Sequence, residues 1–396
     1  MTLRSSAAAL LFPLLFAGSA SAQPPAQSPE KVLRMFLSTS ETGLDPAVAS
    51  DNATLSLLEN LFDPLLRYDY LARPAQLRPN TATAMPEVSA DGLTYTFRIR
   101  PGIHFTPDPA FKGVKREMTA QDYVYSLGRL LDPATKSPWS AMFAGVAELR
   151  ALDRHTLRIR LKAPDNNFLF YLAIPASGAV AREVIEAYPG QAGNHPVGTG
   201  PFMVGEWKRS DRIVLLANPD STAVFQATPG DNQEDKAIAA ALAGKRLPRV
   251  DRVEVRIAEE FQGRMLGFLN AEYDYLEQIP ESMTDMVVRD GQLKPELAAR
   301  GIVLSRFPVL QTYYMWMNMN DPVVGGYGKD RVALRRAISL AYNNAEDIAL
   351  LKKGFAIKAE SPLPPNVLGY DPGYRSPVPY DPALANALLD RYGYSR

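Results

Sequence analysis

The spacing of apolar residues changes repeatedly along this 396-residue chain, and that change limits the fold more than any other feature. Apolar and polar residues alternate in three stretches, which is typical of half-buried strands: 93–100, 157–161 and 253–257. The mostly apolar segment Lys31–Leu37 predicts a further, buried strand. Elsewhere apolar residues recur at helical spacing, behind capping residues in three of the four stretches: 52–62, 119–131, 332–342 and 381–392. Short strands mixed with helices, without a regular βαβ repeat, predict an α/β or α+β assembly.

The composition excludes several classes of function. The 43 Lys and Arg balance the 43 Asp and Glu, and no basic cluster is present, so we expect no nucleic-acid partner. Because Cys is absent, there are no disulfides, thiolate metal sites, cysteine nucleophiles or cysteine-linked lipid anchors. The three His residues lie far apart without ligand spacing, and no phosphate loop, nucleophile elbow or dinucleotide fingerprint occurs. We therefore predict no catalytic residue, no metal site and no cofactor.

The N-terminus predicts export. Arg4 precedes an apolar stretch, Ala7–Ala17, and the small residues Ala20-Ser21-Ala22 then form a cleavage site, which together are typical of a signal peptide at 1–22. An eleven-residue core interrupted by Pro13 is too short to cross a bilayer. We expect cleavage after Ala22 and a soluble periplasmic protein without a lipid anchor.

Two segments are unusual for ordinary strands and helices. The first, His195–Phe202, contains Gly198, Thr199 and Gly200 between two prolines, which suits a rigid crossover better than a phosphate loop, since no Lys follows it. The second, Tyr313–Asn320, has the aromatic run Tyr313-Tyr314-Met315-Trp316 followed by the amides Asn318 and Asn320. This pattern fits either a wall that grips a ligand or a buried strand.

Several short segments, taken in order, form a recognisable series. They are Leu44-Asp45-Pro46, Glu59–Leu65, Ser89–Phe97, Arg100–Phe105, Thr119–Ser126, Pro196–Phe202 with Trp207, Asn218-Pro219, and Asn318 with Leu334–Ile338. In these segments the chain resembles one family: the extracytoplasmic solute-binding proteins of family 5, which serve peptide-type ABC importers. The resemblance extends from about residue 31 to the C-terminus.

The resemblance implies an α/β, two-lobed periplasmic-binding-protein fold of a type II-like kind, with an extra α+β subdomain packed on the first lobe. It assigns 23–50 and 191–310 to the first lobe, 51–190 to the extra subdomain and 311–396 to the start of the second lobe. Family members normally continue well beyond this point. We therefore expect a C-terminally truncated chain with an incomplete second lobe.

The resemblance also implies ligand-binding residues. Ser50, Asp51 and Asn52 match a segment that contacts ligand through its backbone, and Trp139 matches an aromatic residue beside the cleft. Trp139 fits a core tryptophan of the extra subdomain equally well. With the aromatic segment, the expected site comprises Ser50, Asp51, Asn52, Trp139, Tyr314, Trp316 and Asn318, and the residues next to the hinge are Gly198, Thr199, Gly200 and Phe202.

The function implied is that of a receptor, not an enzyme. We expect a monomer that captures a peptide ligand and delivers it to the membrane permease subunits of an ABC importer. One alternative keeps the fold and changes the ligand to a nickel chelate, haem, a sugar or an opine. A more distant alternative is an exported hydrolase that uses paired carboxylates.

Overall fold

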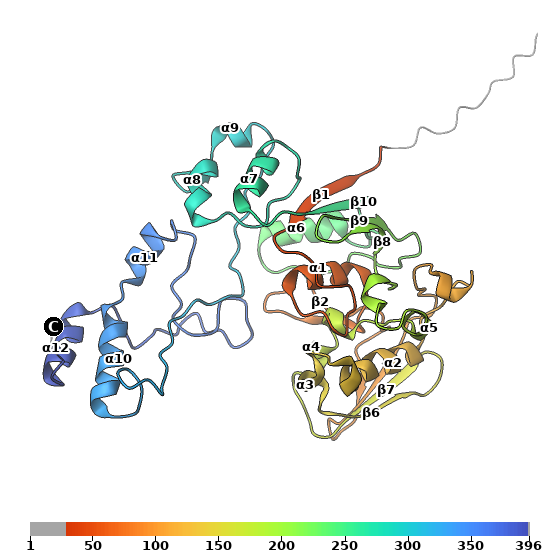
Figure 1. The fold of residues 1–396 in the computed structure, drawn as a ribbon, viewed down its shortest axis with the longest axis horizontal. Helices are drawn as coiled ribbons and strands as arrows, with labels where there is room; N and C mark the ends of the chain where they lie inside the picture. The colour runs from red at the N-terminus through yellow and green to blue at the C-terminus, as the bar shows by residue number, and fades with distance from the viewer. Residues whose placement is uncertain (1–28, 395–396) are drawn as a thin grey trace, which may run out of the picture.

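The computed structural model describes residues 29–394, and the predicted signal peptide, Met1–Ala22, lies outside them. One four-stranded sheet, ordered β1–β10–β9–β8, joins the first described residues to segments far along the chain (Figure 1). Its strands are β1 (Val32–Leu37), β8 (Phe202–Lys208), β9 (Arg212–Ala217) and β10 (Arg252–Ile257). β1 runs parallel to β10, and the other two pairs are antiparallel.

Helix α1 (Asn52–Leu61) supplies the apolar side chains that cover this sheet. Its buried face carries Leu57, Leu58 and Leu61, which pack with Ile213 and Val255 in one core. The predicted helix at 52–62 is therefore confirmed, and its core belongs to the β1–β10–β9–β8 sheet.

The expectation of a buried strand at 31–37 is wrong in one respect. β1 is an edge strand with mostly half-buried side chains, because β10 is its only ladder partner among the described strands. A short segment covers its other edge: the Arg34 N–H donates to Asp274 Oδ2 (2.8 Å), and the Asp274 N–H donates to the Arg34 carbonyl (2.8 Å). Asp274 therefore has a structural role: it pairs with backbone groups on the edge of β1 that would otherwise be unpaired.

A second, antiparallel sheet has the order β4–β5–β7–β6. Alternation places Tyr95, Phe97, Leu157 and Ile159 in its core, as predicted. Helix α2 packs against β6 and β7 with Tyr123, Leu127 and Leu130 in the same core. The elements of this part are β2 (Leu66–Tyr68), β3 (Leu77–Pro79), β4 (Glu87–Val88), β5 (Thr94–Arg98), α2 (Ala120–Leu131), α3 (Ser140–Phe143), β6 (Val146–Ala151), β7 (Thr156–Leu161), α4 (Phe168–Tyr171) and α5 (Arg182–Ala187).

After β10, the chain up to residue 304 forms small helices around a minor core. Met265, Val287, Val288 and Leu297 make up its buried residues. The elements are α7 (Phe261–Leu269), α8 (Thr284–Val287), β11 (Val288–Arg289), β12 (Gln292–Leu293) and α9 (Pro295–Ala298). Helix α6 (Gln233–Leu242), between β9 and β10 in the chain, has no buried residue and stands apart from this core.

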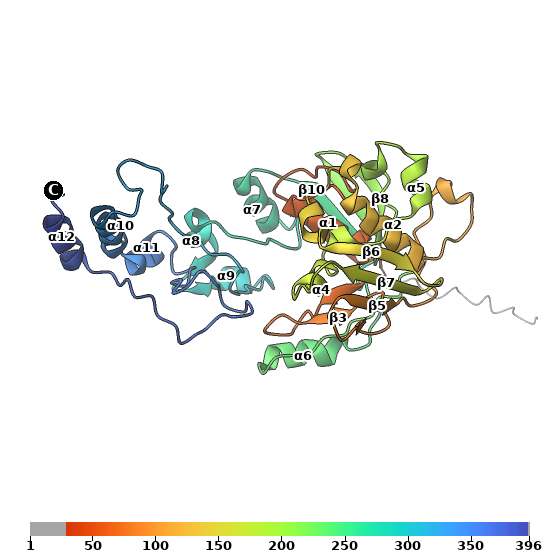
Figure 2. The ribbon, with the colours of Figure 1, turned by 90° about the horizontal axis from the view of Figure 1, so that it is seen from below.

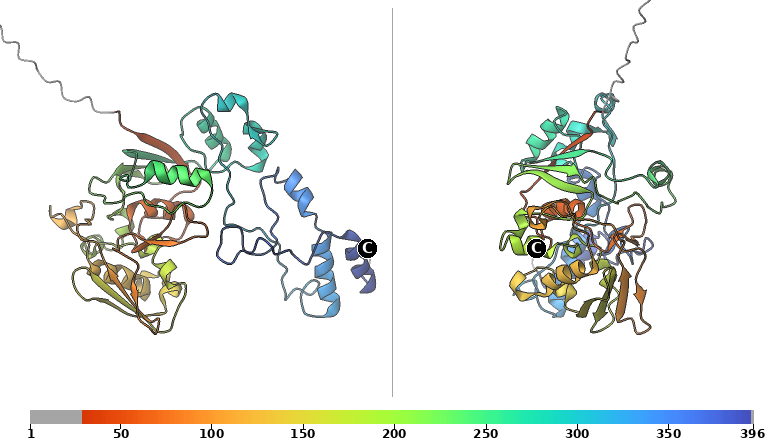
Figure 3. Two further views of the ribbon diagram at one scale, coloured as in Figure 1. Left: turned by 180° about the vertical axis from the view of Figure 1, so that it is seen from behind. Right: turned by 90° about the vertical axis from the view of Figure 1, so that its right-hand side faces the viewer.

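The last elements are α10 (Lys329–Ala341), α11 (Asn344–Leu350) and α12 (Pro382–Arg391), which lie at the opposite end of the molecule from β5 and β7 (Figures 2 and 3). Ala337 and Leu340 of α10 pack against Ala385 of α12. The helical spacing of Leu334, Ala337, Ile338 and Ala341 in the sequence predicts that they share one buried face, but Ala341 is exposed and Leu340 is buried. The reason is that α12 is the principal partner of α10, so the buried stripe is the one turned toward α12. No helix within residues 29–394 has both the length and the apolar character needed to span a bilayer.

Candidate functional site

The start of α1 holds the first group of predicted ligand-binding residues. Asp51 is the N-cap, since its Oδ1 accepts the Thr54 N–H (2.8 Å) and its Oδ2 accepts the Thr42 hydroxyl (2.7 Å). Burial raises the pKa of Asp51, but these hydrogen bonds outweigh it and leave the pKa below its ordinary value. Asp51 is therefore ionised at neutral pH, while Ser50 and Asn52 beside it are exposed to solvent.

Trp139 lies directly beside this helix start. Its Nε1 donates to the carbonyl of Ala49 (2.9 Å), the residue before Ser50. The ring also packs against the core of the β4–β5–β7–β6 sheet. The structure thus brings Trp139 together with the Ser50–Asn52 segment, and the side chain joins the two sheet-bearing parts.

An ion pair that was not predicted holds the loop that precedes Ser50. Asp45 receives two hydrogen bonds from the guanidinium of Arg129 on α2 (2.9 and 2.7 Å), and both side chains are largely buried, at 12% and 13% exposed. Asp45 also accepts the Ala47 N–H (3.1 Å). A bidentate pair of this kind fixes the orientation of both side chains and also stabilises the contact. The loop that leads from Asp45 to Ser50 is therefore rigidly held. The Leu44-Asp45-Pro46 motif signalled Asp45, but nothing in the sequence signalled its partner.

The glycine segment 198–202 is a structural crossover. A Cβ on Gly198 would lie 1.9 Å from the Leu61 carbonyl oxygen, and one on Gly200 would lie 2.6 Å from the Asn60 carbonyl oxygen. The Gly200 N–H donates to the Leu61 carbonyl (3.0 Å). Only glycine allows this contact between the crossover and the end of α1.

Asp63 anchors the same crossover from the other side. Its carboxylate accepts the hydroxyl of Thr199 (2.9 Å) and the amide of Asn80 (3.1 Å), and its carbonyl accepts the Tyr123 hydroxyl (2.8 Å). Burial raises the pKa of Asp63, and the hydrogen bonds from Asn80 and Thr199 oppose that rise. The network links α2 and the residues that follow α1 and β3 to Thr199, so we assign Thr199 a positioning role in the crossover.

The second group of predicted ligand-binding residues stands apart from the first. Tyr314 and Trp316 are 79% and 73% exposed, and Asn318 forms hydrogen bonds only within a local turn. Within the described part of the chain, no hydrogen bond, ion pair or ring contact joins these three residues to Trp139 or to Ser50–Asn52. The interpretation of 313–318 as an ordinary buried strand is wrong, because no neighbouring strand pairs with it there.

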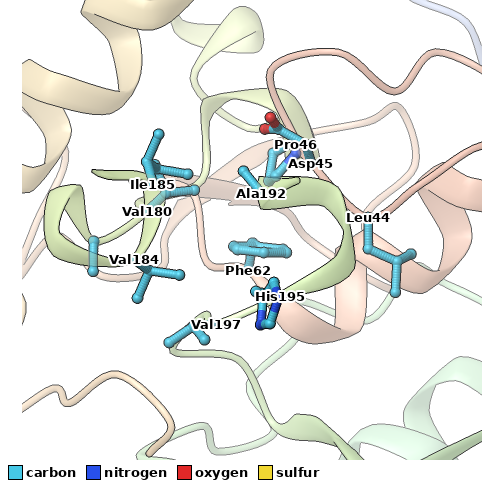
Figure 4. Close-up of a pocket in the computed structure, with 11 residues that line it drawn as sticks. Leu44, Asp45, Pro46, Phe62, Val180, Val184, Ile185, Ala192, His195 and Val197 are labelled. Atoms are coloured by element: carbon cyan, nitrogen blue, oxygen red, sulfur yellow. The ribbon is translucent and has the colours of Figure 1, made fainter. Parts of the chain in front are cut away.

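A small cavity lies next to the crossover but has no room for a ligand (Figure 4). Its volume of about 10 Å³, between Phe62, Val184 and His195, holds at most one water molecule. Residues 29–394 also contain no group of three or more His, Asp or Glu placed to hold a metal ion. Around the helix start, Ser50 and Asn52 are exposed, whereas the Asp51 carboxylate and the Trp139 indole N–H already have partners within the protein.

Comparison with known proteins defines the class of protein to which this arrangement belongs. The family model for "Bacterial extracellular solute-binding proteins, family 5 Middle" matches residues 76–396. The chain belongs to this family. The resemblance found in the sequence is thereby confirmed.

Curated relatives match over most of the chain. "Di/tripeptide-binding protein 2" of Pseudomonas aeruginosa (strain UCBPP-PA14) is 29% identical over 96% of this chain and 66% of its own length. "Glutathione-binding protein GsiB" of Escherichia coli O6:K15:H31 is 26% identical over 89% of this chain and 60% of its own length. The chain therefore spans about 60–66% of the length of these relatives.

Solved structures share the fold. The periplasmic binding protein DppA of Helicobacter pylori, in complex with the peptide STSA, superposes with a TM-score of 0.68 at 23% identity, over 92% of this chain and 67% of the other. NikZ of Campylobacter jejuni, in complex with Ni(L-His), gives a TM-score of 0.65 at 17% identity, over 92% and 63%. The predicted fold class, an α/β fold of the two-lobed periplasmic-binding-protein type, is confirmed.

Proposed function

We propose that this protein captures small peptides in the periplasm and delivers them to the permease subunits of an ABC importer. The observation that carries the proposal is the match to a di/tripeptide-binding protein across 96% of the chain. The family consists of transport receptors, so the proposed role is binding without chemical turnover. The predicted signal peptide at 1–22 would place the protein in the periplasm, where it would act as a monomer.

In this proposal the predicted site residues form two halves of one binding surface. Residues 23–50 and 191–310 form the first lobe, 51–190 the extra subdomain, and 311–396 begin the second lobe. Ser50, Asp51, Asn52 and Trp139 then contact ligand from one side. Tyr314, Trp316 and Asn318 contact it from the other, and the crossover around Gly200 lies next to the hinge.

The physical basis of capture is a difference in affinity between two states. A ligand that touches both halves only when they are close together shifts the population toward closure. Residues 303–317 make no backbone–backbone hydrogen bond within the described chain. Their free N–H and C=O groups support pairing with a peptide main chain in the manner of an added strand.

A second candidate keeps the fold and changes the ligand. Structures of the same fold in complex with Ni(L-His) and with mannopinic acid show that this fold also binds non-peptide solutes. The hydrolase alternative has little support, because Glu259 and Glu260 are exposed and Asp274 is bound to β1.

A thermal-shift panel distinguishes these candidates. The full chain is mixed in turn with dipeptides, tripeptides, glutathione, Ni–histidine, haem, sugars and opines. A ligand at about 100 times its Kd stabilises the folded state by about 2.7 kcal/mol, which is easily measured. We expect a rise in Tm with peptides. A rise with Ni–histidine and none with any peptide would replace the first candidate by the second.

A further inference from the structure

One open cavity is lined by none of the predicted ligand-binding residues. It has a volume of about 630 Å³ and is lined by α8, the β11–β12 hairpin, Arg306, and the end of α11 with the turn that follows it. We call it the hairpin cleft. Its volume lies in the range of small-molecule sites, roughly 300–1,000 Å³.

The charge of the hairpin cleft differs from that of the chain. Its lining includes Arg289, Lys294, Arg306 and Lys353 against Asp285 and Asp290, a net charge of +2, whereas the whole chain is neutral. A concave surface lined mostly by one sign of charge attracts ligands of the opposite sign. The cleft therefore favours an anion.

Two of the cations are free to bind. Within residues 29–394, the side chains of Arg289 and Lys294 form no hydrogen bond or ion pair. The hairpin pairs Arg289 with Gln292, and the Lys294 N–H donates to the Val287 carbonyl (2.9 Å). Arg289 and Lys294 are thus diagonal neighbours on one face of the ladder, with Cα atoms about 7–8 Å apart.

The remaining groups shape the cleft. Arg306 is held in place, since its guanidinium lies 4.6 Å from the centre of the Phe355 ring and donates to the Gly291 carbonyl. Lys353 is only loosely paired, with its Nζ 4.0 Å from an Asp285 oxygen. Phe355 adds an apolar wall, so the cleft suits a short carbon chain with an anionic group at each end.

We propose that the hairpin cleft is a binding site for small molecules that carry two carboxylates, with Arg289 and Lys294 each contacting one of them. This site is additional to the proposed peptide surface and does not depend on it. Either a free dicarboxylate or a peptide with an acidic side chain supplies the required chemistry.

The test is a titration of the full chain with glutarate, followed by calorimetry and by amide chemical shifts. Glutarate should bind saturably and shift the signals of residues 284–294 and 349–355, whereas glutaramide, which lacks the charges, should not. The double variant Arg289→Gln/Lys294→Gln should bind glutarate about tenfold more weakly. The matched control Arg249→Gln/Lys236→Gln removes two exposed cations elsewhere and should bind as the wild type does.

Two peptides identify the source of the carboxylates. If Ala-Glu shifts the same signals more strongly than glutarate does, the ligand of the hairpin cleft is an acidic peptide, and if glutarate is the stronger ligand, it is a free dicarboxylate. The proposal is overturned if glutarate leaves these signals unmoved, or if it binds the double glutamine variant and the wild type equally. If the hairpin-cleft proposal fails in this way but the neutral peptide Ala-Gln still binds, the proposed function of peptide capture is not contradicted.

Discussion

At the scale of single residues, Gly198 is the position where the backbone leaves least room. Because a Cβ there would lie 1.9 Å from the Leu61 carbonyl, Gly198→Ala must displace either the crossover or the end of α1. We expect it to lower the free energy of unfolding by more than about 2 kcal/mol in urea titrations. Gly128→Ala is the matched control, since this α2 glycine has open space around it, and the same change should stabilise by about 0.5–1 kcal/mol. Equal effects of the two substitutions would contradict the close contact.

Glu117 gives a residue-scale prediction that depends on pH. The Gly102 N–H (2.8 Å) and the Arg154 guanidinium (2.6 Å) bind its carboxylate and lower its pKa from 4.5 to about 2. A pKa lowered by folding adds stability above the unfolded value and loses it as the pH falls toward the folded value. Glu117→Gln should therefore be less stable than the wild type at pH 7, and the difference should shrink between about pH 5 and pH 2. A difference that stays constant over this range would show that the charge of Glu117 is irrelevant.

Trp316 connects a single residue to the proposed binding surface. Its ring is 73% exposed, so Trp316→Ala should leave the stability of the ligand-free protein almost unchanged. If the ring contacts bound peptide, the same change should weaken affinity by about 1–3 kcal/mol in fluorescence titrations. Trp207→Phe is the control. The Nε1 of Trp207 on β8 donates to Glu41 Oε1 (2.7 Å), so this substitution should change stability but not affinity. Unchanged affinity for Trp316→Ala would remove this residue from the site.

At the scale of elements, the sequence best predicted the helices and strands that are determined by the local spacing of apolar and capping residues. The strands β5, β7 and β10 follow from strict alternation, and α12 begins at the predicted N-cap, Asp381, whose Oδ1 accepts the Leu384 N–H (2.9 Å). The edge position of β1 was missed, because the burial of a strand depends on partners that lie far along the chain. The Asp63 network and the Asp45–Arg129 pair were missed for the same reason, since each joins residues that only the tertiary fold brings together.

The segment 303–317 shows most clearly what a local sequence pattern cannot predict. The aromatics and amides of Tyr313–Asn320 favoured a buried strand or a cleft wall, yet the described chain offers 303–317 no strand partner and leaves Phe307, Tyr313 and Tyr314 exposed. Backbone without hydrogen bonds opens at little cost, so this segment should be the first to be cut. We expect limited chymotrypsin digestion, read by mass spectrometry, to cleave first after Tyr313, Tyr314 or Trp316. First cleavage within the β4–β5–β7–β6 sheet, where Phe97 is buried, would contradict this order of stability.

At the scale of the whole molecule, the two sheets and their shared crossover form one end, while α10–α12 lie at the other (Figure 2). The Trp139–Ala49 and Asp63–Thr199 hydrogen bonds hold the sheet-bearing parts together. In the connection from α9 to α10, residues 303–317 make no backbone–backbone hydrogen bond within the described chain, so relative movement is expected there. A ligand that contacts both ends would therefore act by closing this connection.

Calorimetric titration of the full chain with di- and tripeptides, followed by chromatography of the recovered peptide, tests the central claim most directly. The account predicts saturable binding of one peptide per chain and recovery of that peptide intact, since the proposed function is binding without chemical turnover. Absence of heat with every peptide, together with saturable binding of Ni–histidine or another non-peptide solute, would contradict peptide capture. Recovery of hydrolysed peptide would contradict the receptor function itself.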